Sequence, residues 1–238
     1  MKIGKLVPWV AGLLVIVAAW LWLLGVRKPG AADQRTVKER LREFGAAASH
    51  RLAPHFEQAG VPYPPARFDL VAFKQERRLE LHAKDSHGHR RLIRSYPVLG
   101  ASGSGGPKLR EGDLQVPEGL YSIELLNPNS RFHVSMRLNY PNEDDIAKAH
   151  RDGRDPAGLG GDIMIHGGAA SVGCIAIGDE AVEEIFVLAA LTGHEKIRVL
   201  IVPWDLRFQS SGDLHRDAPS WTANLHERLR KALTDFPR

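Results

Sequence analysis

Hydrophobic and polar positions follow two different periods along the chain. In residues 33–59 apolar side chains recur every three or four positions, which predicts an amphipathic helix. Residues 60–65 hold three prolines and a glycine and are expected to form a linker. Towards the C-terminus, Trp221, Leu225 and Leu229 share one helical face, which predicts a last amphipathic helix.

Between these stretches the chain alternates in short runs separated by glycine-rich turns, which is typical of strands. A helix is expected over 179–191, with acids in its first turn and Gly193 as its stop. The chain is therefore expected to be mainly β with flanking α-helices. The predicted strands are 70–73, 79–83, 92–96, 121–125, 132–138, 162–166, 174–177 and 197–202.

Residues 6–26 are mostly apolar, so a helix formed by them would be hydrophobic on every face. No charged residue occurs in the 21 residues from Leu6 to Val26. As a helix this run would reach roughly 31 Å, close to the hydrocarbon thickness of a bilayer. Residues 6–26 therefore predict an N-terminal transmembrane helix, with a cleaved signal peptide as the alternative. Either form places the rest of the chain outside the cytoplasm.

The position of the charges along the chain says more about its partners than the total net charge does. The formal net charge is +4, but Lys2, Lys5, Arg27 and Lys28 flank the apolar run and residues 1–28 contain no acid. The remaining chain holds 28 basic and 28 acidic residues and has no net charge. A nucleic-acid partner is therefore not expected.

The chain has one cysteine, Cys174, which excludes an internal disulfide and a cysteine-based zinc cluster. His166 ends one predicted strand and Cys174 begins the next, so we expect the thiol and the imidazole at the same end of the sheet. An imidazole that accepts the thiol proton gives the pair that nucleophilic catalysis needs. The alternative is a tight β-loop with a packed, inert thiol.

Glycine dominates the connection between these two residues. Gly167, Gly168 and Gly173 allow positive φ and can turn backbone N–H groups inward. These N–H groups, together with Ser171, are candidates to stabilise an oxyanion.

Together these residues resemble the active-site motif of the YkuD-type L,D-transpeptidase catalytic domain. The resemblance extends over about residues 68–203 and is strongest with the YafK-like subgroup. It is carried by Ile165-His166-Gly167, Ser171-Val-Gly-Cys174, Leu99-Gly100, Gly112-Asp113, Val116 to Tyr121, Asn127-Pro128 with Ser130, and Leu138 to Asn142.

The resemblance implies a β-sandwich-like domain that acts on peptidoglycan stem peptides in the bacterial cell envelope. Cys174 would be the nucleophile, His166 the general base and acid, and the Gly167 carbonyl would orient His166. Ser171 and Gly173 match the loop beside the oxyanion hole. The implied reaction is acyl transfer through a thioester, with no metal or cofactor.

The implied organisation has four parts. Residues 1–28 are the membrane anchor or signal segment, and 29–65 form a helical extension and linker. The L,D-transpeptidase-like catalytic domain covers 66–203, and 204–238 hold the C-terminal amphipathic helix.

Two positions depart from the common family pattern. Val172 stands where histidine is usual, and Ala176 stands where arginine or asparagine is usual. Arg137 is therefore a candidate contact for a stem-peptide carboxylate, and Tyr140 is a candidate wall of the cleft.

Three other functions remain open. A hydrolase of the same fold would release D-Ala or wall-attached protein, and a non-catalytic module would only bind the wall. In a metal-binding protein, His87 and His89 would hold zinc, but no third ligand lies nearby in the sequence, and residues 85–89 are expected to form a polar hairpin turn instead.

Overall fold

The computed structural model describes residues 34–103, 106–208 and 218–237. Residues 35–238 cluster as one compact unit. The predicted transmembrane segment, 6–26, lies outside the described residues. Within the described part, none of the helices combines the length and the hydrophobicity that a membrane crossing requires.

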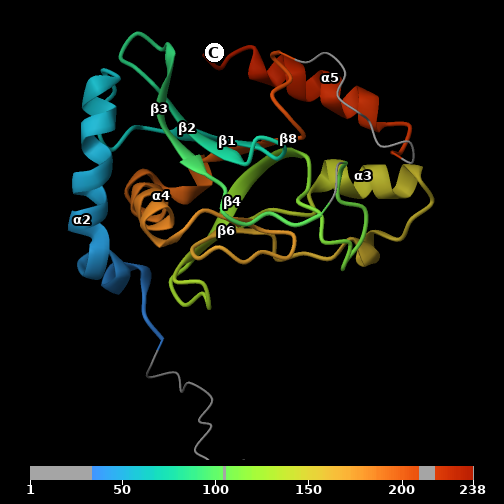
Figure 1. Ribbon diagram of the computed structural model, residues 1–238, viewed down its shortest axis with the longest axis horizontal. Coiled ribbons are helices and arrows are strands. Elements are labelled where there is room, and N and C mark those ends of the chain that lie inside the picture. Colours follow the sequence, from blue (N-terminus) through green and yellow to red (C-terminus); the bar gives the residue numbers. More distant parts are fainter. Residues whose placement is uncertain (1–33, 104–105, 209–217, 238) are drawn as a thin grey trace, which may run out of the picture. The chain divides into compact units, whose positions relative to one another are not determined.

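Eight strands form one mixed sheet in the order β3-β2-β1-β8-β4-β5-β6-β7 (Figure 1). β1 pairs in parallel with β8 and β6 pairs in parallel with β7, whereas the other neighbours are antiparallel. The strands are β1 (Phe68–Phe73), β2 (Arg78–Lys84), β3 (Arg90–Pro97), β4 (Gly119–Asn127), β5 (Ser135–Leu138), β6 (Met164–His166), β7 (Ile175–Ala176) and β8 (Arg198–Val202).

β4 divides the sheet into two halves. Its first residues, 119–122, pair with β8, and the residues from Ile123 onward pair with β5. The register shifts between Ile123 and Leu125, and such an irregularity bends a strand and increases its twist. The sheet therefore curves into a half-barrel, with β6 and β7 at one end of the strand order.

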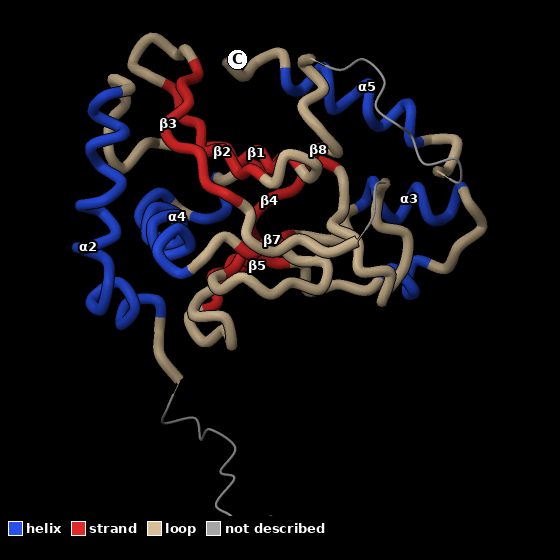
Figure 2. The backbone as a smooth tube through the Cα atoms, in the orientation of Figure 1, coloured by secondary structure: helices blue, strands red, loops and turns tan. Residues whose placement is uncertain are grey.

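The half-sheet around β1 and β8 is buried on both faces, which explains its near-continuous hydrophobic runs. One face packs against α4 (Asp179–Thr192) and α2 (Val37–Gln58), and α5 (Thr222–Leu233) covers the other (Figures 1 and 2). The first core contains Leu70, Ala72, Val199 and Ile201, and the second contains Val71, Phe73, Leu200 and Val202.

α2 begins with a capping box, in which the Glu39 N–H donates to Thr36 Oγ1 and the Thr36 N–H donates to Glu39 Oε2. It docks against α4 through an ion pair from Arg51 to Glu183 (2.7 Å) and another to the buried Glu184 (2.9 Å). Leu52 lies fully buried in the same interface.

The prediction of a mainly β chain with flanking helices is confirmed. One helix was missed: α3 (Glu143–Arg151) is only nine residues long and mostly polar, and its buried face includes Asp145 and Lys148, so few apolar side chains mark it in the sequence. Its N-terminal signal is a capping box between Asn142 and Asp145. Two single-turn 3₁₀ helices, η2 (Pro156–Leu159) and η3 (His194–Lys196), complete the described elements.

The predicted hairpin turn between β2 and β3 is confirmed. Asp85 Oδ1 accepts from the N–H groups of His87 and His89, both at 2.9 Å. The Asp85 N–H in turn donates to the His89 carbonyl.

Leu52→Ala should lower the free energy of unfolding by about 2–5 kcal/mol, because it removes a fully buried side chain from the α2–α4 interface. Leu191→Ala is the matched control, since Leu191 is 48% exposed on α4. It should cost less than about 1 kcal/mol. Chemical denaturation measures both, and equal losses would contradict the packing of α2.

Candidate active site

The pairing of β6 with β7 decides where His166 and Cys174 lie. In this parallel ladder Ile165 pairs with Ile175 and His166 pairs with Ala176. Cys174, just before β7, therefore stands level with Met164. Because side chains alternate along a strand, Met164, His166 and Cys174 share one face of the sheet.

The His166 ring is buried and its orientation is fixed. Its Nδ1–H donates to the Gly167 carbonyl at 2.7 Å, which leaves the Nε2 lone pair as the basic position. The Phe132 ring stacks on the imidazole at 4.6 Å between centroids and an interplanar angle of 27°. Burial lowers the pKa of His166, and the bond to Gly167 opposes that shift only in part. The imidazole is therefore neutral near pH 7.

The thiol of Cys174 is half-buried and protonated. Burial raises its pKa, a backbone hydrogen bond from Met164 lowers it, and the charge of Asp162 raises it again. The Sγ–H donates to the Asp162 carbonyl at 3.6 Å. The resting thiol is thus directed at the backbone, and the pair is a neutral thiol and a neutral imidazole.

Both side chains open into the same surface pocket, which has a volume of about 470 Å³. One wall is the segment 127–132 before β5, and the other is the loop that carries Ser171 and Val172. Val172 is 73% exposed and presents an apolar side chain to the pocket. The pocket is open to solvent, so a ligand has direct access to Sγ.

The backbone near His166 leaves no room for a side chain at position 167. A Cβ on Gly167 would lie 2.4 Å from Asp179 Oδ1 and 2.7 Å from the Phe132 carbonyl. Asp179, the first residue of α4, accepts from the Gly168 N–H at 2.8 Å. The start of α4 thereby holds the loop that follows the histidine. In the sequence this acid is recognisable only as part of a helix start.

The two expected oxyanion donors are engaged in other bonds. Ser171 Oγ–H donates to the Cys174 carbonyl and the Gly173 N–H donates to Ser102 Oγ, both at 2.6 Å. Their observed contacts fix the turn that presents Cys174. Ser102 was missed because it lies 72 positions before Cys174, in a turn without periodicity.

α2 holds the wall of the pocket. The Arg35 N–H donates to Asn129 Oδ1, and Asn129 Nδ2–H donates back to the Arg35 carbonyl, both at 2.8 Å. Arg40 donates to the carbonyls of Pro128 (2.8 Å) and His133 (3.4 Å). Since Phe132 stacks on His166, α2 is connected to the imidazole through this wall.

Tyr140 and Arg137 do not line this pocket. Tyr140 is buried, packs against Tyr121, and donates to the Leu159 carbonyl at 3.4 Å. Arg137 pairs with Glu124 at 2.6 Å and reaches Asp162, which does line the pocket, at 3.4 Å. Arg131 provides a lining cation instead.

Metal-binding geometry is not found in the described part of the chain. No three His, Cys, Asp or Glu side chains come close enough there to hold an ion, around His87 and His89 or elsewhere. The rings of these two histidines are 6.3 Å apart and stand in a turn.

Comparison with known proteins agrees with this arrangement. Residues 68–201, more than half of the chain, match the YkuD L,D-transpeptidase catalytic domain. The chain belongs to this family. It is 36% identical over 172 residues to the Escherichia coli (strain K12) protein named "Putative L,D-transpeptidase YafK". The match covers 70% of this chain and 65% of that protein, so the chain spans less than two thirds of its curated relatives.

Solved structures resemble the chain more remotely. The helical cell shape determining protein Pgp2 of Campylobacter jejuni has a TM-score of 0.46 at 23% identity and covers 58% of this chain and 48% of its own. L,D-transpeptidase 1 of Mycobacterium tuberculosis has a TM-score of 0.33 at 13% identity and covers 57% and 62%.

Alkylation of Cys174 by iodoacetamide should reach half its maximal rate at a higher pH than a small free thiol treated in parallel. The reason is that burial raises the pKa of the thiol and only the thiolate reacts. In His166→Gln the midpoint should stay nearly the same, because the imidazole is already neutral in this pH range. A midpoint below that of the free thiol would reveal a preformed thiolate–imidazolium pair and contradict the neutral pair.

Arg40→Ala should speed amide hydrogen exchange in residues 128–133, because two carbonyls of this wall lose their donor. Arg42→Ala is the matched control: Arg42 is exposed on the same helix and makes no hydrogen bond to the wall within the described residues. Equal protection of the wall in both variants would show that α2 does not hold it.

Proposed function

We propose that the chain is a cysteine acyltransferase that acts on peptidoglycan stem peptides through a thioester. The proposal rests on one observation: a thiol and a fixed, neutral imidazole share one face of the sheet and one open pocket. Membership of the L,D-transpeptidase family supplies the substrate class. The predicted membrane anchor would place the reaction in the bacterial envelope, where these peptides are found.

The reaction would begin with rotation of the Cys174 side chain away from the Asp162 carbonyl. His166 Nε2 then takes the thiol proton as Sγ attacks the carbonyl carbon of the scissile amide. When the tetrahedral intermediate collapses, the C–N bond breaks and the imidazolium returns the proton to the departing amine of a D-amino acid. A thioester on Cys174 remains.

The second half-reaction repeats these steps with a new nucleophile. His166 takes a proton from an acceptor amine, which attacks the thioester and displaces the thiolate as the new amide forms. Such transfer conserves the energy of the broken amide in the thioester and needs no nucleotide. Water at the same position would give hydrolysis, and the pocket is open enough to admit it.

Hydrolysis is therefore the second candidate function. The observation that favours it is the exposed Val172 at the pocket rim, which offers an acceptor amine no hydrogen bond. Product masses distinguish the two reactions, because transfer yields cross-linked dimers and hydrolysis yields a shortened peptide with one added water.

Incubation of the full chain with purified muropeptides should yield a protein whose intact mass has increased by one acyl group on Cys174. Cys174→Ala should abolish the adduct and all products. His166→Gln should slow acylation by about 10²–10⁴-fold, the usual contribution of a general base.

Asp155→Asn is the matched control, because Asp155 caps η2 through the Ala157 N–H and does not line the pocket. It should acylate like the parent. An adduct that persists in Cys174→Ala, or a parent that binds muropeptides without any covalent adduct, would exclude the thioester. The second result would identify the chain as a wall-binding module.

A further inference from the structure

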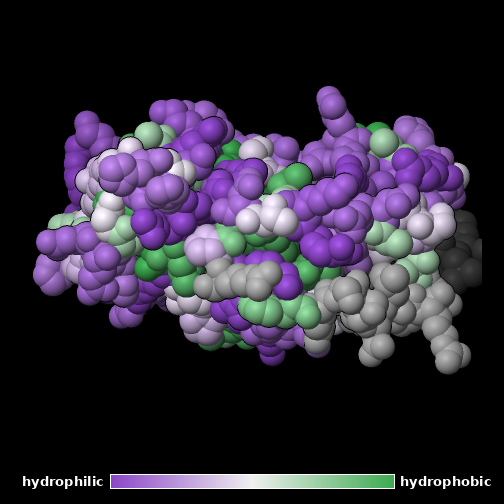
Figure 3. Space-filling view, turned by 90° about the horizontal axis from the view of Figure 1, so that it is seen from above, coloured by the Kyte–Doolittle hydropathy of each residue, from purple (hydrophilic) through white to green (hydrophobic). Residues whose placement is uncertain are grey.

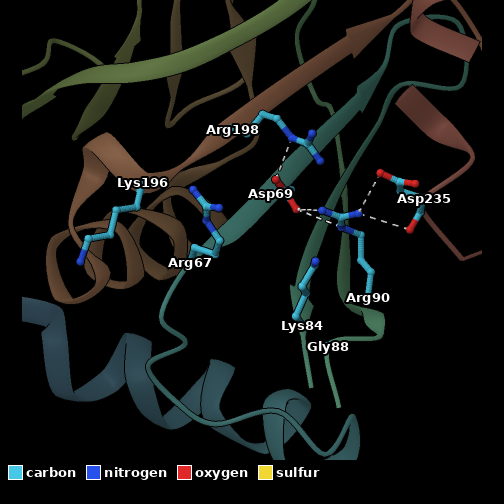
Figure 4. A pocket seen from close by; sticks show the side chains of 8 residues that line it. All are labelled: Arg67, Asp69, Lys84, Gly88, Arg90, Lys196, Arg198 and Asp235. Carbon is cyan, nitrogen blue, oxygen red and sulfur yellow. Dashed lines mark hydrogen bonds and ion pairs between the residues drawn. The ribbon is translucent and has the colours of Figure 1, made fainter. Parts of the chain in front are cut away.

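A second pocket, of about 590 Å³, lies in the half of the sheet that does not contain His166 and Cys174 (Figure 4). The starts of β1, β3 and β8 and the end of β2 converge around it. Its lining holds five cations and two carboxylates, and the charged residues are Arg67, Lys84, Arg90, Lys196, Arg198, Asp69 and Asp235.

The floor of this basic pocket is an ordered cluster around Asp69. Its Oδ2 accepts from Arg90 at 2.7 and 3.0 Å, and its Oδ1 accepts from Arg198 Nε at 3.0 Å. Arg90 and Arg198 also lie over the ring of Phe236, at 4.3 and 5.6 Å from its centroid. Both guanidinium groups are thereby fixed before any ligand arrives.

The Lys and Arg side chains that line the pocket outnumber its carboxylates. Arg67, Lys84 and Lys196 are exposed, and none of them forms an ion pair within the described residues. In Figure 4 the Lys84 side chain extends towards Asp69 and Arg90, and Lys196 points away from them. The pocket therefore carries a net charge of +3 although residues 29–238 as a whole are neutral by sequence.

We propose that the basic pocket binds the phosphate groups of a multiply charged ligand, such as a diphosphate. Arg198 donates its Nε–H to Asp69 and lines the pocket, so its terminal nitrogens are not needed for that bond, and Lys84 adds a flexible ammonium from another strand. Cations that approach from several strands suit a tetrahedral anion, and a net charge of +3 matches a diphosphate better than a single carboxylate. Figure 3 shows that the surface seen from above is mostly hydrophilic, with some hydrophobic side chains exposed near its middle.

Isothermal titration of the full chain in neutral detergent with inorganic diphosphate tests the site. Diphosphate should bind more tightly than malonate, a dicarboxylate, and the affinity should fall as salt increases. Lys84→Ala combined with Arg67→Ala should weaken diphosphate binding by about tenfold or more, the usual effect of losing charge-assisted contacts. Both residues are exposed, so the fold should survive.

Lys38→Ala is the matched control, because Lys38 is an exposed lysine at the start of α2. It should bind diphosphate like the parent, as should Cys174→Ala, since the site is independent of the proposed catalysis. No measurable binding, equal binding of malonate, or equal losses in Lys38→Ala and the double variant would each overturn the proposal.

A competition experiment distinguishes a lipid headgroup from a soluble ligand as the source of the phosphate. Micelles doped with phosphatidic acid should displace diphosphate if the natural ligand is a lipid headgroup. Undisturbed diphosphate binding in these micelles identifies a soluble phosphorylated ligand. In both cases Lys84→Ala should reduce the binding that is observed.

Discussion

The short connection between β6 and β7 is the constraint on which the site depends. Parallel strands normally need a crossover of about a dozen residues or more, but here residues 167–174 suffice. Gly168 and Gly173 make this possible, because both have φ in the left-handed region, at 66° and 87°. The result is a ladder in which Cys174 stands two positions before the partner of His166. Their backbones are offset by about 6.6 Å along the strand, close enough for side chains to meet.

This geometry needs support from elements distant in sequence. Asp179 at the start of α4 holds the Gly168 N–H, and Ser102 holds the Gly173 N–H. α2 contributes from outside the matched family segment, since Arg40 binds the wall that carries Phe132. A helix between a predicted anchor and the β domain is thus part of the site's scaffold. A displacement of the N-terminal end of α2 would be transmitted to the His166 imidazole through the stacked Phe132 ring.

The sequence alone predicts the features that follow from local residue patterns, which are the strands, most of the helices and the candidate catalytic pair. The strand and helix periods follow from burial on one or both faces, and the candidate pair followed from a histidine and a cysteine flanking a glycine-rich loop. The sequence predicts only that the thiol and the imidazole lie at the same end of the sheet, and the parallel register supplies the geometric detail. Apolar periodicity did not reveal α3, which is short and whose buried face includes the charged residues Asp145 and Lys148. It also could not reveal that Tyr140 is buried against Tyr121, because that contact depends on how the half-barrel curves.

Because Cys174 and His166 are both uncharged, the thiol can be accessible to a ligand and still resist oxidation. A thiol that lines an open pocket is accessible to oxidants, and the thiolate is the form that they attack. Burial raises the pKa of Cys174 and lowers the pKa of His166, so both side chains are uncharged near pH 7. A charged pair in this half-buried place would lose hydration without a ligand to compensate. In the proposed reaction a bound peptide would provide an electrophile at the moment of proton transfer, so the reactive thiolate would form only as it is consumed. The fixed Nδ1–H bond to Gly167 ensures that the base is already in the correct tautomer at that moment.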